Sequence, residues 1–420
     1  MRPQFDIDDP TLARAAWSRL AEPADRQAGA LVQAIGPSAA LRWLVQAPSE
    51  RPEAWPQAAA RGAGPGPGGR RGPELTPVCG DGADGIGREL TKARERWRVR
   101  LEDLDPRREL RALERLGGTL ITPEAPGWPA GLADLGPEMP FCLWVRARAD
   151  APARLGQLLT PSVAVVGARA STSYGESMTA AIVGDLAGRG VAVVSGGAFG
   201  IDAAAHRAAL AQGGFTVAVM AGGVDRFYPA GNDGLLKAVA QEGAVVSELP
   251  PGAAPRRERF LSRNRLIAAL ATVTVVTEAG WRSGSQRTAS VAAELLRPVA
   301  AVPGPATSPQ SAGCHKLIRQ GMATLVTGAD EVRELMAPLG LVTLVEPPVA
   351  AGPLDGLPPS DRQVLDALPV RRGAGLTALV AASGLSTPQV MAALSRLERA
   401  GRAVQSGGAW RKARPAAGSA

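Results

Sequence analysis

Cysteine and histidine are scarce in this sequence. Its 420 residues include three cysteines, Cys79, Cys142 and Cys314, and no two of them form a C-x-x-C pair. An odd and scattered set of cysteines supports neither a disulfide framework nor a zinc site. His206 and His315 are the only histidines, so general bases are few. We therefore expect a reducing compartment, no disulfide and no bound metal.

Long apolar runs are also lacking. The longest, from Leu266 to Val276, is too short to cross a bilayer, and residues 1–10 contain no apolar signal core. These absences predict a cytoplasmic protein that does not contact the membrane.

The standard nucleotide-binding motifs are missing as well. No G-x-G-x-x-G follows a predicted strand, and no G-x-x-x-x-G-K-[ST] occurs. A dinucleotide-binding domain carries an acidic residue for the ribose after its second strand, where this chain has Ser195-Gly196. The sequence therefore supports neither an NAD-binding nor an ATP-binding site, and we expect no cofactor.

Basic residues are present in modest excess. Lysine and arginine number 47 against 39 aspartate and glutamate, which gives a formal net charge of +8. This balance favours a polyanionic partner. Because the excess is small, the positions of the basic residues are better evidence for such a partner than the net charge.

The chain divides into three predicted folded regions and two linkers. Residues 1–50 have apolar side chains at helical spacing and predict a small helical domain, SAM-like or helix-hairpin-like. Residues 51–82 and 341–358 are rich in proline and glycine, and such segments offer too few apolar groups to offset the loss of chain entropy. We therefore expect linkers there, a central domain at 83–340 and a C-terminal domain at 359–414.

The central region has the clearest order. Seven apolar runs rich in β-branched residues begin at intervals of roughly 25 to 28 residues, the length of one strand plus one helix. The segments between them have helical periodicity. The pattern predicts an α/β fold with a Rossmann-like, doubly wound parallel sheet covered by helices on both faces. The runs begin near Val163, Val191, Thr216, Ala244, Thr272, Val299 and Thr324.

Two loops of this predicted sheet offer groups for an anion. Ligands of such sheets bind beyond the carboxyl ends of the strands, where loops lead into helix N-termini. The loop after the first strand offers N–H groups, hydroxyls and a guanidinium, and the loop after the second has three glycines that allow close approach of a ligand. Alternatively, the glycines only form tight turns that the packing of the chain requires. The predicted binding residues here are Gly167, Arg169, Ser171, Ser195, Gly196, Gly197, Phe199, Gly200 and Asp202.

An arginine-rich segment follows the fourth predicted strand. Residues 256–265 contain five arginines and one acidic residue. A solvated charge run is the usual explanation of such a segment, but Phe260 interrupts it and it lies at the expected ligand edge, so we favour a phosphodiester-binding surface. A later loop adds phosphate-contact candidates. The predicted binding residues are Arg257, Arg259, Arg263, Asn264 and Arg265 from the segment, and Arg282, Ser283 and Ser285 from the loop.

Two aromatic residues are candidates for stacking on bases. Phe199 belongs to the glycine-rich loop and Trp281 precedes Arg282. Each either supplies a platform for an unpaired base or packs in the core. Because polar and glycine residues flank Trp281, we expect its side chain to be exposed.

Catalysis has little support in the sequence. Ser195, Asp202 and His206 lie close together, but Asp202 and His206 are four residues apart on one predicted helix, where side chains simply pair. No G-x-S-x-G elbow surrounds Ser195, because residue 193 is valine. We therefore predict no catalytic residues and a protein that is not an enzyme.

The ordered motifs of the central region resemble the DprA/Smf DNA-processing family. The similarity covers nearly the whole region. It is carried by Gly167-Ala168-Arg169, by the segments 195–206 and 222–225, by Arg263-Asn264-Arg265 and by the segment 313–318, G-C-H-K-L-I.

This resemblance implies a homodimer that binds and protects single-stranded DNA and loads the RecA recombinase onto it, in DNA uptake, natural transformation and recombination. Arg169 and Arg263-Asn264-Arg265 fall on motifs with which the family contacts DNA. Several members have lysine or arginine where this chain has Phe199, which replaces a charge contact with possible stacking. Many members end in a winged helix, and residues 359–414 resemble one.

Two other functions compete with this one. Phosphoribohydrolases that release bases from nucleotides have a similar topology but carry P-G-G-x-G-T-x-x-E, where residues 278–285 read E-A-G-W-R-S-G-S. A winged-helix transcription regulator would need tight duplex specificity, which the sequence does not indicate. We therefore predict a non-catalytic protein that binds single-stranded DNA.

Overall fold

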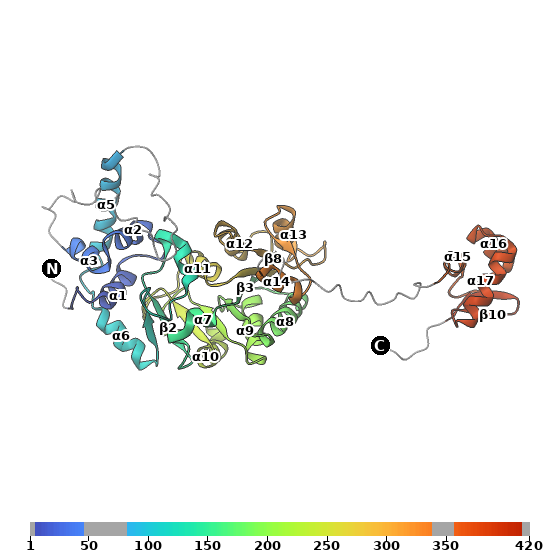
Figure 1. The fold of residues 1–420 in the computed structure, drawn as a ribbon, viewed down its shortest axis with the longest axis horizontal. Helices are drawn as coiled ribbons and strands as arrows, with labels where there is room; N and C mark the ends of the chain where they lie inside the picture. The colour runs from blue at the N-terminus through green and yellow to red at the C-terminus, as the bar shows by residue number, and fades with distance from the viewer. Residues whose placement is uncertain (1–4, 46–81, 338–356, 414–420) are drawn as a thin grey trace. The chain divides into compact units, whose positions relative to one another are not determined.

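The computed structural model describes residues 5–45, 82–337 and 357–413 (Figure 1). The chain forms two compact units, Met1–Leu344 and Val345–Ala420. Most of the two predicted linkers, residues 51–81 and 341–356, lies outside the described residues.

A nine-stranded sheet forms the centre of the first unit. Seven strands, β3 to β9, are parallel, and β1 and β2 extend one side of the sheet in antiparallel pairing. The predicted α/β class is thus confirmed, and the seven predicted runs are the seven parallel strands. In spatial order the strands are β1 (Thr119–Ile121), β2 (Leu143–Ala147), β6 (Ala244–Ser247), β5 (Thr216–Val219), β4 (Ala192–Ser195), β3 (Ser162–Gly167), β7 (Val273–Glu278), β8 (Val299–Ala301) and β9 (Thr324–Leu325).

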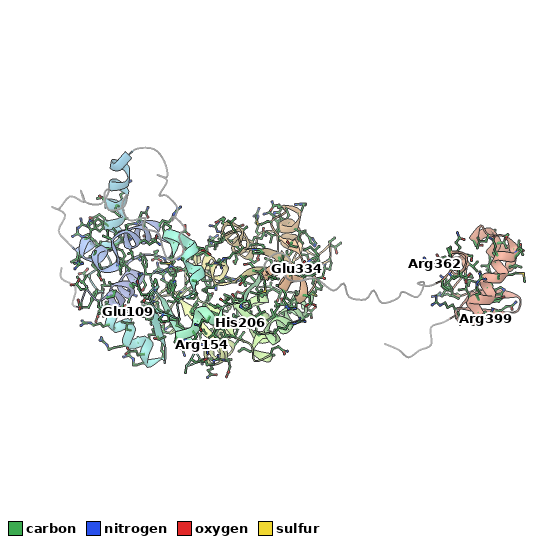
Figure 2. The ribbon with its side chains drawn as sticks, in the orientation of Figure 1. Glu109, Arg154, His206, Glu334, Arg362 and Arg399 are labelled. Atoms are coloured by element: carbon green, nitrogen blue, oxygen red, sulfur yellow. The ribbon has the colours of Figure 1, made fainter. Side chains whose placement is uncertain are left out.

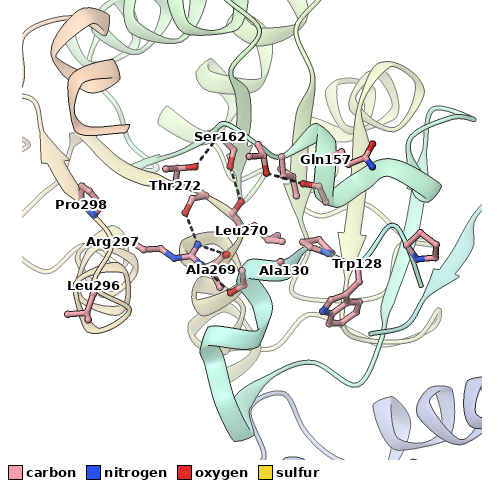
Figure 3. A pocket seen from close by; sticks show the side chains of 17 residues that line it. Trp128, Ala130, Gln157, Ser162, Ala269, Leu270, Thr272, Leu296, Arg297 and Pro298 are labelled. Atoms are coloured by element: carbon pink, nitrogen blue, oxygen red, sulfur yellow. Dashed lines mark hydrogen bonds between the residues drawn. The ribbon is translucent and has the colours of Figure 1, made fainter. Parts of the chain in front are cut away.

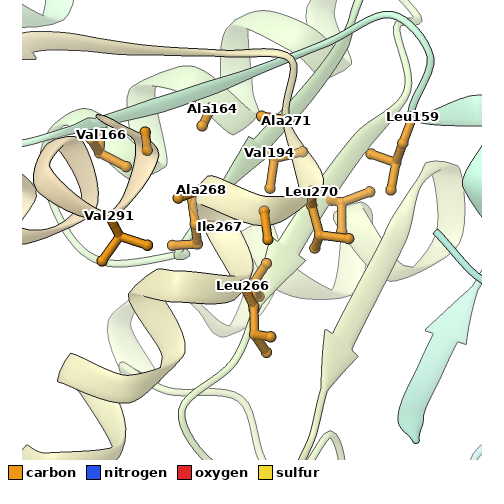
Figure 4. Close-up of a cluster of buried hydrophobic side chains, with 14 of the residues drawn as sticks. Leu159, Ala164, Val166, Val194, Leu266, Ile267, Ala268, Leu270, Ala271 and Val291 are labelled. Atoms are coloured by element: carbon orange, nitrogen blue, oxygen red, sulfur yellow. The ribbon is translucent and has the colours of Figure 1, made fainter. Parts of the chain in front are cut away.

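Helices cover both faces of the sheet, as the continuous apolar strands require. Successive strand residues point to opposite faces, so Val163 and Val165 pack in one core while Ala164 and Val166 pack in another. Figure 4 shows the second core, where Leu266 belongs to the helix that covers it. The helices of this region are α7 (Leu155–Leu158), α8 (Ser173–Gly188), α9 (Ile201–Ala211), α10 (Asp233–Glu242), α11 (Arg257–Leu270), α12 (Ser285–Glu294), α13 (Ala312–Arg319) and α14 (Ala329–Met336), with short 3-10 turns η1 (Ala130–Glu138), η2 (Pro152–Arg154) and η3 (Ala230–Asn232).

The N-terminal helices form their own core and also contact the sheet (Figure 1). Trp17 and Trp97 meet edge to face with ring centroids 5.3 Å apart, so residues on both sides of the first predicted linker share this core. The Trp144 indole of β2 donates to the Ser18 hydroxyl at 3.2 Å, which joins the helices to the sheet. The helices are α1 (Pro10–Leu20), α2 (Arg26–Ile35), α3 (Pro37–Val45), α5 (Gly82–Arg98) and α6 (Pro106–Arg115).

The second unit has a separate small core. Val364, Leu379, Leu394 and Leu397 are buried together, and Ser386 begins α17 with a capping box. Its elements are α15 (Pro359–Ala367), α16 (Leu376–Ser383), α17 (Thr387–Arg399) and the hairpin β10 (Ala403–Ser406) with β11 (Ala409–Lys412).

In the described part of the chain, no single helix has the length and apolar content needed to cross a membrane. Only α16 and α17, bent by 103° at their junction, reach that length and composition as a pair.

Candidate functional site

The strand order reverses between β3 and β7. The chain moves outward from β3 through β4 and β5 to β6, and then returns to the other side of β3 to form β7. In open α/β sheets the ligand binds at such a reversal, beyond the carboxyl ends of the strands. A pocket of about 500 Å³ lies there.

The pocket collects residues that are far apart in the sequence. They come from the loops after β3, β4, β7 and β8 and from helices α9, α11 and α12. Eight of the predicted binding residues line the pocket: Gly167, Arg169, Asp202, Arg263, Asn264, Arg282, Ser283 and Ser285. The other nine do not: Ser171, Ser195, Gly196, Gly197, Phe199, Gly200, Arg257, Arg259 and Arg265.

Arg169 is an exposed cation in the lining of the pocket. Its guanidinium carbon lies 5.2 Å from the centroid of the Phe260 ring, and Phe260 in turn lies 5.6 Å from Tyr228. Within the described residues, Arg169 has no hydrogen bond or ion pair, so its N–H groups face solvent. Phe260 was not among the predicted contacts, although its place within the arginine run was a usable signal. The stacked pair offers a fixed positive charge to a phosphate.

Arg263 is buried beneath the pocket. It donates to the carbonyl of Gly196 at 2.8 Å and also to that of Val219. Burial lowers the pKa of Arg263 to about 10; Asp202 opposes this lowering and Arg169 adds to it, so the group stays charged at neutral pH. A Cβ atom at Gly196 would lie 2.4 Å from the guanidinium, which accounts for glycine there. Through its hydrogen bond to Gly196, the buried Arg263 therefore holds the loop after β4 in place.

The loop after β4 is held on several sides. The Asn232 amide donates to the carbonyls of Gly197 and Ala198, both at 3.0 Å, and Asp202 accepts from the Ala198 N–H at 3.3 Å. Burial raises the pKa of Asp202, while Arg263 opposes that rise. Gly200 has φ +75°, and a Cβ there would lie 2.3 Å from the Ala168 carbonyl. Phe199 is 49% exposed on this fixed loop, so it does not pack in the core.

The start of α8 differs from what the sequence suggested. Thr172 donates to Glu278 through its N–H at 2.8 Å and through its hydroxyl at 2.7 Å, and the Ser171 hydroxyl donates to Glu176 at 2.7 Å. These donors were expected to be free for a phosphate. Two carboxylates of the chain itself already occupy them, because a helix N-terminus attracts any nearby anion.

Three further predicted residues are engaged inside the protein. Arg265 forms a buried two-point ion pair with Glu248 at 2.7 and 2.6 Å. Arg259 forms a two-point ion pair with the partly exposed Glu22, at 3.0 Å for both bonds. The Ser195 hydroxyl donates to a carbonyl of β3 at 2.6 Å. These contacts stabilise the fold and direct the polar atoms away from solvent. Arg257, by contrast, is exposed at the start of α11.

The loop after β7 forms the other wall of the pocket. Arg282 is exposed, and the hydroxyls of Ser283 and Ser285 lie 2.7 Å apart. Asn264 connects α11 to this loop by donating to the Gly284 carbonyl at 3.3 Å. Trp281 is 55% exposed, as its neighbours predicted.

The position of His206 suits a structural role and not a catalytic one. Figure 2 marks its place in the first unit. It is fully buried, and its Nδ1 lies 2.8 Å from the Thr216 hydroxyl. Thr216 donates to the Val193 carbonyl at 3.0 Å, so the imidazole must donate from Nδ1. Burial, together with the nearby Arg263, lowers the pKa of His206 to about 3. In the described residues no hydrogen bond joins it to Ser195 or Asp202, and no group of three His, Cys, Asp or Glu side chains could hold a metal.

A larger pocket of about 780 Å³ lies at the opposite end of the strands (Figure 3). Arg297 is the charged residue of its lining, and it donates to the carbonyls of Ala268 and Ala271 at 2.9 and 2.7 Å and to Asp134 at 2.8 Å. Its guanidinium therefore caps the C-terminal end of α11 and is not available to a ligand. Because charge rather than volume decides where a polyanion binds, we take the smaller pocket as the candidate site.

Comparison with known proteins gives a consistent result. The family model described as DNA recombination-mediator protein A matches residues 119–337. A Mycobacterium tuberculosis protein with the name DNA processing protein DprA is 43% identical over 424 residues, covering 99% of this chain and 97% of its own. The structure of DNA processing protein A from Streptococcus pneumoniae is 34% identical with a TM-score of 0.51, over 59% of this chain and 83% of that chain. A Helicobacter pylori DNA processing protein A, solved for its single-stranded DNA binding mode, is 27% identical with a TM-score of 0.45, over 51% of this chain and 93% of that chain.

Proposed function

Because this chain belongs to the DprA (Smf) family of DNA processing proteins, we propose that it binds single-stranded DNA at the β3–β7 pocket and acts as a recombination mediator. One observation carries the proposal: Arg169 is exposed and stacked on Phe260 at the point where the strand order reverses. Single-stranded nucleic acids bind to surfaces of this kind, where cations meet phosphates and aromatic rings stack on bases.

The proposed contacts are of two kinds. Arg169, Arg257 and Arg282 are exposed and bind phosphates, and binding releases counterions, so affinity falls as salt rises. Phe199 stacks on a base, a contact worth about 1 to 3 kcal/mol. Arg263 and Asp202 act indirectly, because they hold the loop that presents Phe199.

We propose that the protein binds DNA without cleaving it. The competing phosphoribohydrolases carry a motif that ends in a glutamate eight residues after its proline. Counted from residue 278, that position is Gln286, whose amide donates to the carbonyls of Gly280 and Trp281, both at 2.8 Å. Release of free base from nucleoside monophosphates by the pure protein would contradict this part of the proposal.

Several finer assignments accompany the proposal. We place the protein in the cytoplasm as a homodimer that loads RecA onto the bound strand, in natural transformation and recombination. The predicted domain bounds, 1–50, 83–340 and 359–414, are retained as proposals. Three helices followed by a two-stranded hairpin support a winged helix for the last of them.

The test compares arginines at the two ends of the sheet. The double variant R169A/R282A should bind single-stranded oligonucleotides at least about tenfold more weakly than the wild type. Its plot of log affinity against log salt should also be shallower by about 1.4, since each lost phosphate contact removes about 0.7. Arg154, exposed in η2, supplies the control R154A, which should bind like the wild type. Unchanged affinity in a folded R169A/R282A protein would refute the proposal.

A further inference from the structure

Trp281 is an exposed aromatic residue at the rim of the pocket. Its side chain is 55% exposed, whereas its neighbours Gly280 and Arg282 both line the pocket. An indole exposed to this degree loses the free energy that burial would provide. At the rim of a ligand pocket, the exposed ring is therefore available to stack on a bound molecule.

The backbone around Trp281 is fixed. The Gln286 amide of α12 donates to the carbonyls of Gly280 and of Trp281, both at 2.8 Å. The oxygen of the same amide accepts from Lys316 of α13 at 3.2 Å, and the Lys316 ammonium lies 5.5 Å from the centroid of the indole ring. The ring is therefore presented from a rigid loop with a cation beside it, and little entropy is lost when a partner stacks on it.

The strand order places Trp281 in line with the other groups of the site. At the carboxyl ends, Phe199 follows β4, Arg169 follows β3 and Trp281 follows β7, and these three strands are neighbours in that order. Neighbouring strands are about 4.8 Å apart, so the two aromatic residues lie on either side of Arg169 along one edge. An extended chain that contacts Phe199 and Arg169 reaches Trp281 when it continues in the same direction.

The charge around Trp281 favours a polyanion. Between Glu278 and Asp330 the sequence contains a single acidic residue, Glu294. The same stretch contains five basic residues: Arg282, Arg287, Arg297, Lys316 and Arg319. A cation-rich rim with an exposed ring fits a nucleic acid strand, which offers a phosphate for the cations and a base for the ring in every nucleotide.

We infer that Trp281 is a second base-stacking position, at which single-stranded DNA leaves the β3–β7 pocket, with Lys316 contacting the adjacent phosphate. The inference rests on the proposed function and extends it, because it gives the bound strand a path towards β8. Phe199 and Trp281 then hold bases on the two sides of the phosphate that Arg169 binds.

The experiment measures how affinity depends on oligonucleotide length. Full-length wild type, W281A and W281F are titrated with oligothymidylates from about 4 to about 16 nucleotides. For the longer oligonucleotides W281A should bind about 5- to 150-fold more weakly, the loss expected for one stacked base, while W281F should keep most of the affinity. The shortest oligonucleotides should show a smaller difference, because they fit within the pocket.

Controls separate the possible outcomes. Leu296 is 93% exposed at the amino ends of the strands, so L296A tests the loss of an exposed apolar side chain elsewhere and should bind normally. Equal affinity of W281A and wild type at every length would overturn the inference while leaving the proposed function intact. Failure of the wild type to bind any oligonucleotide would overturn the proposed function itself.

Indole fluorescence gives a second measurement. Stacking should quench Trp281, so oligonucleotide binding should quench the wild type more than W281F, which keeps seven of the eight tryptophans. Equal quenching in the two proteins would overturn the inference. So would a W281A protein that binds DNA normally but has lost self-association, because the ring would then belong to a protein contact.

Discussion

The carboxylate of Glu278 accepts a hydrogen bond from the Thr172 N–H at 2.8 Å and another from the Thr172 hydroxyl at 2.7 Å. This contact connects the end of β7 to the start of α8 and places a negative charge at a helix N-terminus, where the helix dipole favours it. The anion site at the start of α8 is therefore filled by the protein itself. A bound phosphate must use the guanidinium groups at the rim instead.

Removing this carboxylate should destabilise the protein. E278A removes a buried carboxylate and leaves two donors of the half-buried Thr172 without a partner, which should lower the free energy of unfolding by about 2 to 4 kcal/mol. Glu176 is exposed and accepts one bond from Ser171, so the control E176A should change stability by less than about 1 kcal/mol. Urea denaturation of both variants measures the difference. Equal stability of E278A and E176A would contradict the role given to Glu278.

Gly200 should not tolerate a side chain. G200A combines φ +75° with a Cβ 2.3 Å from a backbone oxygen, so it should cost more than about 2 kcal/mol of stability and weaken DNA binding by shifting Phe199. At Gly234 in α10 an added Cβ would enter open space, with no described neighbour within 4 Å, and G234A should stabilise by about 0.5 to 1 kcal/mol. Thermal unfolding and oligonucleotide titration test both. A G200A protein as stable as the wild type would show that the loop relaxes freely.

His206 should make stability depend on pH. Its pKa is about 3 when folded and ordinarily 6.5, so between these values the unfolded chain binds the extra proton. The stability that neutral His206 provides is complete above pH 6.5 and is lost as pH falls towards 3, by up to about 1.4 kcal/mol per pH unit. Asp202, whose pKa is raised by burial, acts in the opposite direction.

The variant H206N isolates the histidine contribution. Asparagine retains a donor for Thr216 but does not titrate, so the stability of H206N should fall less than that of the wild type between pH 7 and 5. Denaturant unfolding at several pH values gives both curves, and Asp202 contributes equally to each. Parallel curves would show that His206 does not titrate on unfolding.

The Arg265–Glu248 pair should be replaceable by apolar residues. E248A alone leaves a buried guanidinium unpaired and should cost about 3 to 5 kcal/mol. The double variant R265M/E248L should be within about 2 kcal/mol of the wild type and should bind single-stranded DNA equally well. If the folded double variant lost affinity, Arg265 would have to contact DNA, as its sequence motif first suggested.

The two units should unfold separately. Leu394 is buried in the core of the second unit, so L394A should destabilise that unit by about 2 to 5 kcal/mol. Differential scanning calorimetry should then show one transition at a lower temperature and the other unchanged. A single transition that moves as a whole would show that the two units fold cooperatively.

Local patterns in the sequence predicted the sheet and its ligand edge, because strand spacing and loop composition depend on neighbouring residues. The residues that pair with the arginines could not be predicted from the sequence. Arg259 pairs with Glu22, 237 residues away in the N-terminal helices, and no spacing rule connects them. Arg263 and Arg265 belong to the same arginine-rich segment as the exposed Arg257, yet both are buried, because α11 is buried at every position from Arg263 to Leu270. The exposure of Trp281 was predictable because its immediate neighbours determine it.

The Asn232 amide, bonded to the carbonyls of Gly197 and Ala198, also bears on the kinetics of binding. A loop held in this way needs no rearrangement after the first collision with a strand. The association rate would then be set by diffusion and long-range attraction and would slow as ionic strength increases. The residence time would instead depend on how quickly the bases unstack from the aromatic side chains, and salt has less influence on that step.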